Sequence, residues 1–242
     1  MAEIGNINNI AQFGIMRDRA NALGPTYAPT NASISAAALA AKYTAADNAQ
    51  TDFIARLVAA KGPINDRQVI FLPTDRLVTR TLNYYRSTGA TPQAIADAKS
   101  LADRFRGHGI KSPTLPDGTT DPDHVSNSHQ GYIQRTETFA TLIALYQTDP
   151  LYAPAGPSFS DITIAALTTI LTAMKASNDA VSLALAPFNL ARIARDKELY
   201  APNTGLYDLQ NLVKLYAKAA FGATSQQAKQ FTTLRFTKPR HL

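Results

Sequence analysis

The chain lacks cysteine and is poor in charge, and these absences remove several classes of function. Without cysteine among its 242 residues, disulfides, a thiolate nucleophile and sulfur-ligated metals are excluded. It has only 3 glutamates, and none is paired at the inward-facing helical spacing of a di-metal carboxylate site. The glycine patterns of phosphate-binding and dinucleotide-binding loops are also missing. We therefore expect a protein that is not an enzyme and needs no cofactor.

Signals for export and for membrane insertion are not found either. The N-terminus has neither the basic start nor the apolar run of a secretory signal, and no stretch approaches ~18 uninterrupted apolar residues. We expect a protein without a membrane span that stays in the cytoplasm by default, although a non-standard export route would leave no mark in the sequence.

The residues that are present favour helices. Hydrophobic residues make up 45% of the chain and charged residues 17%, and alanine is abundant, which suits closely packed helices. The turn Gly89–Gln93 reappears as Gly222–Gln226, and the pairs Leu77-Val78 and Leu212-Val213 precede the two turns. This repetition predicts an all-α, elongated bundle made of two related antiparallel halves that arose by internal duplication.

Proline and glycine set the expected boundaries. The segment between Gly107 and Pro122 contains three prolines and cannot hold a helix, so the boundary between the halves is placed there. The expected division is an N-terminal arm over 1–32, a first bundle over 33–107, a linker over 108–123, a second bundle over 124–233 and a basic tail over 234–242.

Spacing and caps predict individual helices. Apolar positions from Leu39 to Ala60 recur at intervals of four and three, which aligns one face of a long helix that Gly62-Pro63 should interrupt. Thr74 and Thr91 are expected to cap two following helices, and Thr224 a third in a capping box. In the second half, five residues share a helix face, namely Tyr132, Thr136, Phe139, Ile143 and Tyr146.

A later long helix contains Pro187, which should bend or break it. The aromatic residues Tyr85, Phe105 and Phe236 fall on apolar faces, so they are expected to be core residues and not a surface for stacking bases.

The C-terminal region resembles a family of uncharacterised bacterial helical proteins. The resemblance is carried by Val-Lys-x-Tyr-x-Lys followed by Phe-Gly-Ala-Thr-Ser within 212–225, by 234–238, by 191–196 and 200–206, and by 77–99. It implies a helical fold over most of the chain and no site residue.

One loop offers residues that could hold a metal. Asp121-Pro122-Asp123-His124 lies close to His129, with His108 across the loop, but the spacing matches no established zinc or calcium loop. We favour a proline-containing turn with a helix cap. Ser126 and Ser128 complete the residue types of a Ser/His/Asp set, yet no nucleophile elbow accompanies them.

Charge varies in sign along the chain, which bears on association. Residues 67–111 carry 8 basic and 3 acidic residues, 112–186 carry 2 and 7, and 187–242 carry 9 and 3. Such asymmetry can steer association with another copy or another protein, so a structural or protein-interaction function is our first hypothesis. The alternative is a binder of nucleic-acid backbone. The basic residues that could form either surface are Arg76, Arg80, Arg86, Arg104, Arg106, Arg192, Arg195, Lys197, Arg235, Lys238 and Arg240.

Overall fold

The computed structural model describes residues 2–107 and 131–238, and all regular structure in these ranges is helical. The α-helices are α1 (Ala2–Ala22), α2 (Ala36–Phe71), α3 (Thr74–Ser87), α4 (Pro92–Arg106), α5 (Tyr132–Thr148), α6 (Ile164–Tyr200), α7 (Leu206–Phe221) and α8 (Gln226–Thr232), and three short 3-10 turns precede α2 and α6. The expected all-α class is confirmed.

The described chain folds into two compact units that differ from the halves expected from the repeat. Unit 1 is formed by residues 1–60 and 184–242, and unit 2 by residues 61–183. The boundary expected at 108–123 therefore falls inside unit 2. The division differs because each long helix, α2 and α6, contributes one part to each unit, so unit 2 is the continuous middle of the sequence and unit 1 combines its two ends.

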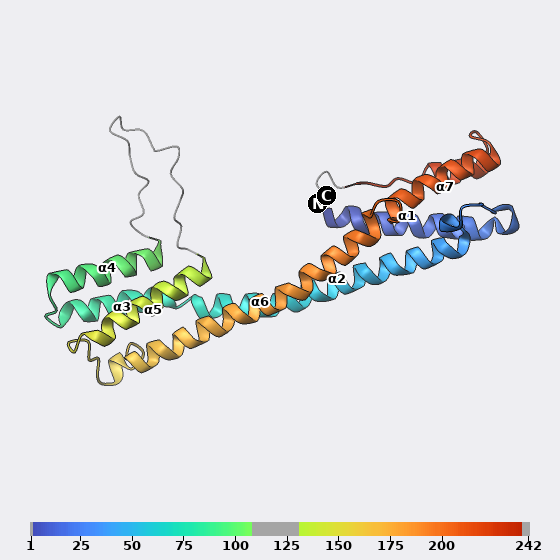
Figure 1. Cartoon of the computed structure of the whole chain (residues 1–242). Helices are drawn as coiled ribbons and strands as arrows, with labels where there is room; N and C mark the ends of the chain where they lie inside the picture. Colours follow the sequence, from blue (N-terminus) through green and yellow to red (C-terminus); the bar gives the residue numbers. More distant parts are fainter. Residues whose placement is uncertain (1, 108–130, 239–242) are drawn as a thin grey trace, which may run out of the picture. The chain divides into compact units, whose positions relative to one another are not determined.

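Unit 2 contains the end of α2, then α3, α4 and α5, and the first part of α6. Figure 1 shows α3, α4 and α5 lying side by side, with α4 in contact with both neighbours. Its core includes Tyr85, Phe105, Phe139 and Tyr146, whose side chains are almost fully buried. The expected face of α5 is confirmed, because Thr136, Phe139, Ile143 and Tyr146 are all buried and Tyr132 is half-buried.

Unit 1 contains α1, the first part of α2, the last part of α6, and α7 with α8. Helices α1, α7 and α8 contact one another, and Phe13, Met16, Leu39 and Phe231 are central in the core. The segment expected as an arm is thus mostly α1, whose apolar side is buried in this unit. A helix with Phe13 and Met16 on one side is stabilised by covering that side.

Proline does not end either long helix. Gly62-Pro63 was expected to interrupt a helix, but α2 continues through Pro63 to Phe71, and α6 likewise continues through Pro187. Proline removes one backbone donor. In α2, buried residues before and after the proline, such as Ala60 and Phe71, pack in the core and keep the helix continuous despite the lost hydrogen bond.

Two of the three expected caps are displaced by one residue. Thr91 caps α4 as expected, since its side chain accepts a hydrogen bond from the Ala94 N–H. The α3 N-cap is Pro73, and Thr74 instead donates its hydroxyl to the Phe71 carbonyl at 2.6 Å. At α8 the cap is Ser225, not Thr224, and its hydroxyl accepts from the Ala228 N–H at 3.0 Å.

The first part of the C-terminal tail is anchored. The backbone of Thr237 exchanges two hydrogen bonds with the side chain of Asn9 in α1, at 2.7 and 2.9 Å. The ammonium of Lys214 donates to the Leu234 carbonyl at 2.7 Å, and burial lowers the pKa of this lysine. Residues 234–238 therefore belong to the folded unit.

The two loops before the long helices have the same construction. The Tyr27 hydroxyl donates to the Ile34 carbonyl at 2.8 Å, and the Tyr152 hydroxyl donates to the Ile162 carbonyl at 2.8 Å. Directly after each isoleucine, a hydroxyl side chain caps the long helix at 3.2 Å, Ser35 for α2 and Thr163 for α6. Burial raises the pKa of both tyrosines above the ordinary value.

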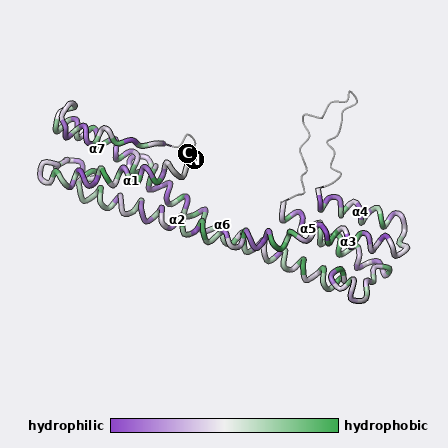
Figure 2. Tube along the Cα trace, turned by 180° about the vertical axis from the view of Figure 1, so that it is seen from behind, coloured by the Kyte–Doolittle hydropathy of each residue, from purple (hydrophilic) through white to green (hydrophobic). Residues whose placement is uncertain are grey.

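One described segment has the length and composition of a membrane span, although none was expected. Residues 157–200 are long and apolar enough to cross a membrane. Few of the residues in the most apolar part of this segment are buried. Alanine, leucine and isoleucine raise the mean hydropathy of this segment, while the threonines among them interrupt the apolar run. Figure 2 shows hydrophobic and hydrophilic residues alternating along α6.

Candidate functional site

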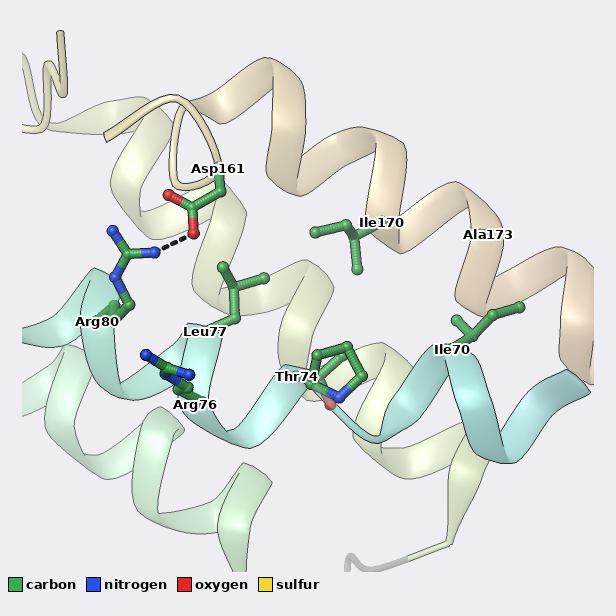
Figure 3. A pocket seen from close by; sticks show the side chains of 9 residues that line it. Ile70, Thr74, Arg76, Leu77, Arg80, Asp161, Ile170 and Ala173 are labelled. Carbon is green, nitrogen blue, oxygen red and sulfur yellow. Dashed lines mark hydrogen bonds and ion pairs between the residues drawn. The ribbon is translucent and has the colours of Figure 1, made fainter. Parts of the chain in front are cut away.

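Unit 2 contains a cavity of about 580 Å³. Apolar side chains of three helices line it, with Ile70 from the end of α2, Leu77 from α3, and Ile170 and Ala173 from α6. Figure 3 shows Ile70, Leu77 and Ile170 directed into the space between these helices. A volume of this size with mostly apolar walls is typical of a binding site for an apolar group.

An ion pair closes one end of the cavity. The Arg80 guanidinium contacts the Asp161 carboxylate and also donates to the Ser158 carbonyl at 2.9 Å. Both partners are partly exposed, with side chains 39% and 46% accessible, so the pair adds little to stability. It instead fixes the loop before α6 against α3.

A second arginine at the cavity has no partner among residues 2–107 and 131–238. Arg76 lies one turn before Arg80 on α3 and is exposed. Within the described part of the chain, no hydrogen bond or ion pair holds its guanidinium. A free guanidinium beside an apolar cavity favours a ligand with a negatively charged group next to its apolar part.

Local sequence explains how the wall is built. Pro73 separates α2 from α3, and α3 contributes Arg76, Leu77 and Arg80 to the lining of the cavity. Arg76 and Arg80 are four residues apart in α3 and lie on the same face of the helix. The next helix supports this wall, because Arg106 donates to Thr79 at 3.0 Å and pairs with Asp103 at 2.8 Å.

The other basic residues expected at an interaction surface do not belong to this cavity. Arg86 and Arg104 are exposed in unit 2, while Arg106 is half-buried and paired. In unit 1, exposed basic residues include Arg192, Lys197, Arg235 and Lys238. Arg240 lies outside the described residues.

Arg195 is a core residue and not a surface residue. Only 3% of it is exposed, its guanidinium lies 4.0 Å from the centre of the Phe53 ring, and it pairs with Asp196 at 2.8 Å. Ile193, two residues before Arg195 in α6, is 61% exposed. The Arg195 guanidinium stacks on the Phe53 ring and is buried with it.

The candidate metal loop cannot be placed. Asp121 to His129, with Ser126 and Ser128, and His108 lie outside the described residues. In the ranges the structure does describe, no group of three or more potential ligands gathers at a point where a metal could bind.

Five residues of the cavity lining were not singled out in the sequence, namely Ile70, Pro73, Asp161, Ile170 and Ala173. Asp161 is 81 positions from Arg80, and no local pattern connects them.

Comparisons with family models, with curated proteins and with solved structures find no match. The resemblance to a bacterial helical family therefore stays a prediction.

Proposed function

We propose that the chain is a non-catalytic protein-interaction protein, and that the cavity of unit 2 holds an acidic amphipathic helix of a partner protein. The observation that supports it is the combination of an apolar cavity with the guanidinium of Arg76 in its lining, which has no partner among the described residues. A partner helix would insert a large aliphatic side chain between Leu77 and Ile170 and place a carboxylate near Arg76.

The charges around the cavity favour a single negative group. Arg76 and Arg80 contribute two positive charges, and Asp161 contributes one negative charge. Because Asp161 repels a second negative charge at the same place, a carboxylate is preferred over a doubly charged phosphate. Glutamate or aspartate beside leucine meets both requirements.

A synthetic peptide tests the proposal. The probe is a capped helical peptide of about 14 residues, roughly four turns, with two leucines one turn apart and a glutamate on the next turn. We call it the leucine–glutamate peptide. We expect it to bind, and Arg76→Glu to weaken binding about tenfold, because charge reversal replaces attraction by repulsion. Fluorescence anisotropy of the labelled peptide measures this.

Matched controls separate the cavity from general charge. Arg192→Glu makes the same charge change at an exposed position of unit 1 and should leave the affinity unchanged. A peptide with serine for leucine and glutamine for glutamate should not bind. Equal losses for Arg76→Glu and Arg192→Glu would refute the cavity as the binding site.

Self-assembly is a second candidate, and exposed aliphatic side chains favour it. Unit 1 exposes five large aliphatic residues on its parts of α2 and α6, namely Ile54, Leu57, Val58, Leu190 and Ile193. Leu190 and Ile193 are 67% and 61% exposed and three positions apart in one helix. Exposed apolar residues that lie one turn apart on a helix, as these two do, are found at interaction surfaces.

Light scattering tests self-assembly. If a second copy covers this surface, the protein is expected to have a mass above the 26.1 kDa of one chain at low and at high salt, since apolar contacts are not screened. Leu190→Asp with Ile193→Asp should then restore the mass of one chain. A wild-type monomer at high concentration would contradict self-assembly.

Nucleic-acid binding has less support. Among the basic residues considered for it, Arg80, Arg106 and Arg195 are held by aspartates and are not available to phosphates without losing those pairs.

A further inference from the structure

The two long helices correspond position by position. A shift of 128 relates the caps Ser35 and Thr163 and the buried pairs Leu39 and Leu167, Ala46 and Met174, Phe53 and Val181, and Phe71 and Leu199. The same shift relates Gln50 to Asn178, and each of these two amide side chains has a buried oxygen without a partner among the described residues. Helix register and burial thus agree along the full length of α2 and α6.

Helices α3 and α7 correspond at a shift of 132. Tyr84 packs edge-on against the loop tyrosine Tyr152 at 5.4 Å and 83°, and Tyr216 packs edge-on against Tyr27 at 5.1 Å and 83°. The buried Leu77 then corresponds to the buried Leu209. The sequence comparison paired Leu77 with Leu212, three residues further along. Three residues are close to one helical turn, so both pairings place an apolar residue on the same face of α7.

With these two shifts, each helical residue that lines the unit 2 cavity has an equivalent residue in unit 1. Ile170 corresponds to Lys42 and Ile70 to Glu198. The Lys42 ammonium and the Glu198 carboxylate form an ion pair at 2.8 Å, with side chains 15% and 30% exposed. Where unit 2 has two isoleucines facing a cavity, unit 1 has a charged pair in contact.

The two arginines of the unit 2 cavity also have different residues at the equivalent positions of unit 1. Arg76 corresponds to Asp208, whose carboxylate accepts from the Asn203 N–H at 2.9 Å. Arg80 corresponds to Leu212, which packs against the core of unit 1. The equivalent place in unit 1 therefore lacks the two isoleucines and the two arginines of the cavity.

We infer that the two units are diverged copies of one helical unit, and that Ile70 and Ile170, with Arg76, determine which copy binds a ligand. This inference rests on the proposed function of the cavity. Each copy in the sequence begins one unit with its first helices and completes the other unit with the second part of its long helix and the helices after it. Each compact unit therefore contains residues from both halves of the sequence. One chain consequently binds one acidic helix.

Two transplants test the inference by calorimetric titration with the leucine–glutamate peptide. Ile70→Glu with Ile170→Lys places the unit 1 ion pair in unit 2 and should abolish binding. Lys42→Ile, Glu198→Ile and Asp208→Arg together give unit 1 the three cavity determinants and should raise the stoichiometry from one to two. Replacing an ion pair by apolar residues of similar volume is often tolerated.

The possible outcomes distinguish a failure of this inference from a failure of the proposed peptide-binding function. If the wild-type protein binds one peptide but the first variant keeps binding, or the second variant folds and still binds one, the inference is wrong and the cavity function stands. If the wild-type protein binds no peptide, both fail. Thermal melting followed by circular dichroism provides the folding check, and the first variant should melt close to wild type because its ion pair is already accommodated in unit 1. A strongly destabilised first variant would also contradict the equivalence.

Discussion

Raising the pH above 10 is expected to unfold the protein steeply. Burial raises the pKa of Tyr85 and of Tyr146 to about 12, and it raises the pKa of Tyr27 and Tyr152 as well. In the unfolded chain a tyrosine ionises near ~10. Between these values the unfolded state releases protons that the folded state retains, so the free energy of unfolding falls as the pH rises.

The size of this effect follows from proton linkage. Each such tyrosine removes up to about 1.4 kcal/mol per pH unit in that range, and several act together against a typical total of about 5–15 kcal/mol. Below pH 10 their contribution is fully present. Helical circular dichroism and the absorbance of tyrosinate should change together as the pH rises.

A variant isolates one of these tyrosines. Tyr152→Phe removes the hydroxyl that donates to the Ile162 carbonyl, and we expect it to be less stable than wild type at neutral pH by about 1–2 kcal/mol. Because it has one ionisable group fewer, its disadvantage should shrink above pH 10. Ionisation of all 10 tyrosines near pH 10 without loss of helix would contradict the burial described here.

Phe139→Ala is expected to destabilise unit 2 by about 3–5 kcal/mol. The Phe139 side chain is fully buried in α5, and its ring lies 5.7 Å from the ring of Phe105 in α4. Truncation leaves a cavity at the contact between these helices, and the surrounding core relaxes only in part. Urea or thermal unfolding followed by circular dichroism measures the loss.

A control on the same helix distinguishes packing from helix propensity. Ile133 is 62% exposed, so Ile133→Ala should change the stability by less than about 0.5 kcal/mol. If Phe139→Ala melted like Ile133→Ala, the packing of α4 against α5 would be wrong.

Local patterns predicted the faces of single helices but not how helices combine. The spacing in α5 identified Thr136, Phe139, Ile143 and Tyr146 because all of them face one core. Continuity through Pro63 was missed, since it depends on residues that pack before and after the proline. The two crossing units were missed for the same reason: which part of a long helix packs with which partner is decided by contacts far apart in sequence.

The candidate site was predictable in part. Arg76 and Arg80 share a helix face by spacing alone. Their different roles were not visible, because Asp161 and the Ser158 carbonyl, which hold Arg80 and leave Arg76 free, come from a loop about eighty positions away. The apolar walls combine α2, α3 and α6, and only their assembly produces a cavity.

The most direct test of the account is nuclear magnetic resonance of the isoleucine methyl groups during titration with the leucine–glutamate peptide. Ile70 and Ile170 line the cavity, whereas Ile54 and Ile193 are exposed in unit 1. The account predicts that the signals of Ile70 and Ile170 shift in proportion to bound peptide while those of Ile54 and Ile193 stay in place. Shifts at Ile54 and Ile193 with unchanged cavity signals would contradict it.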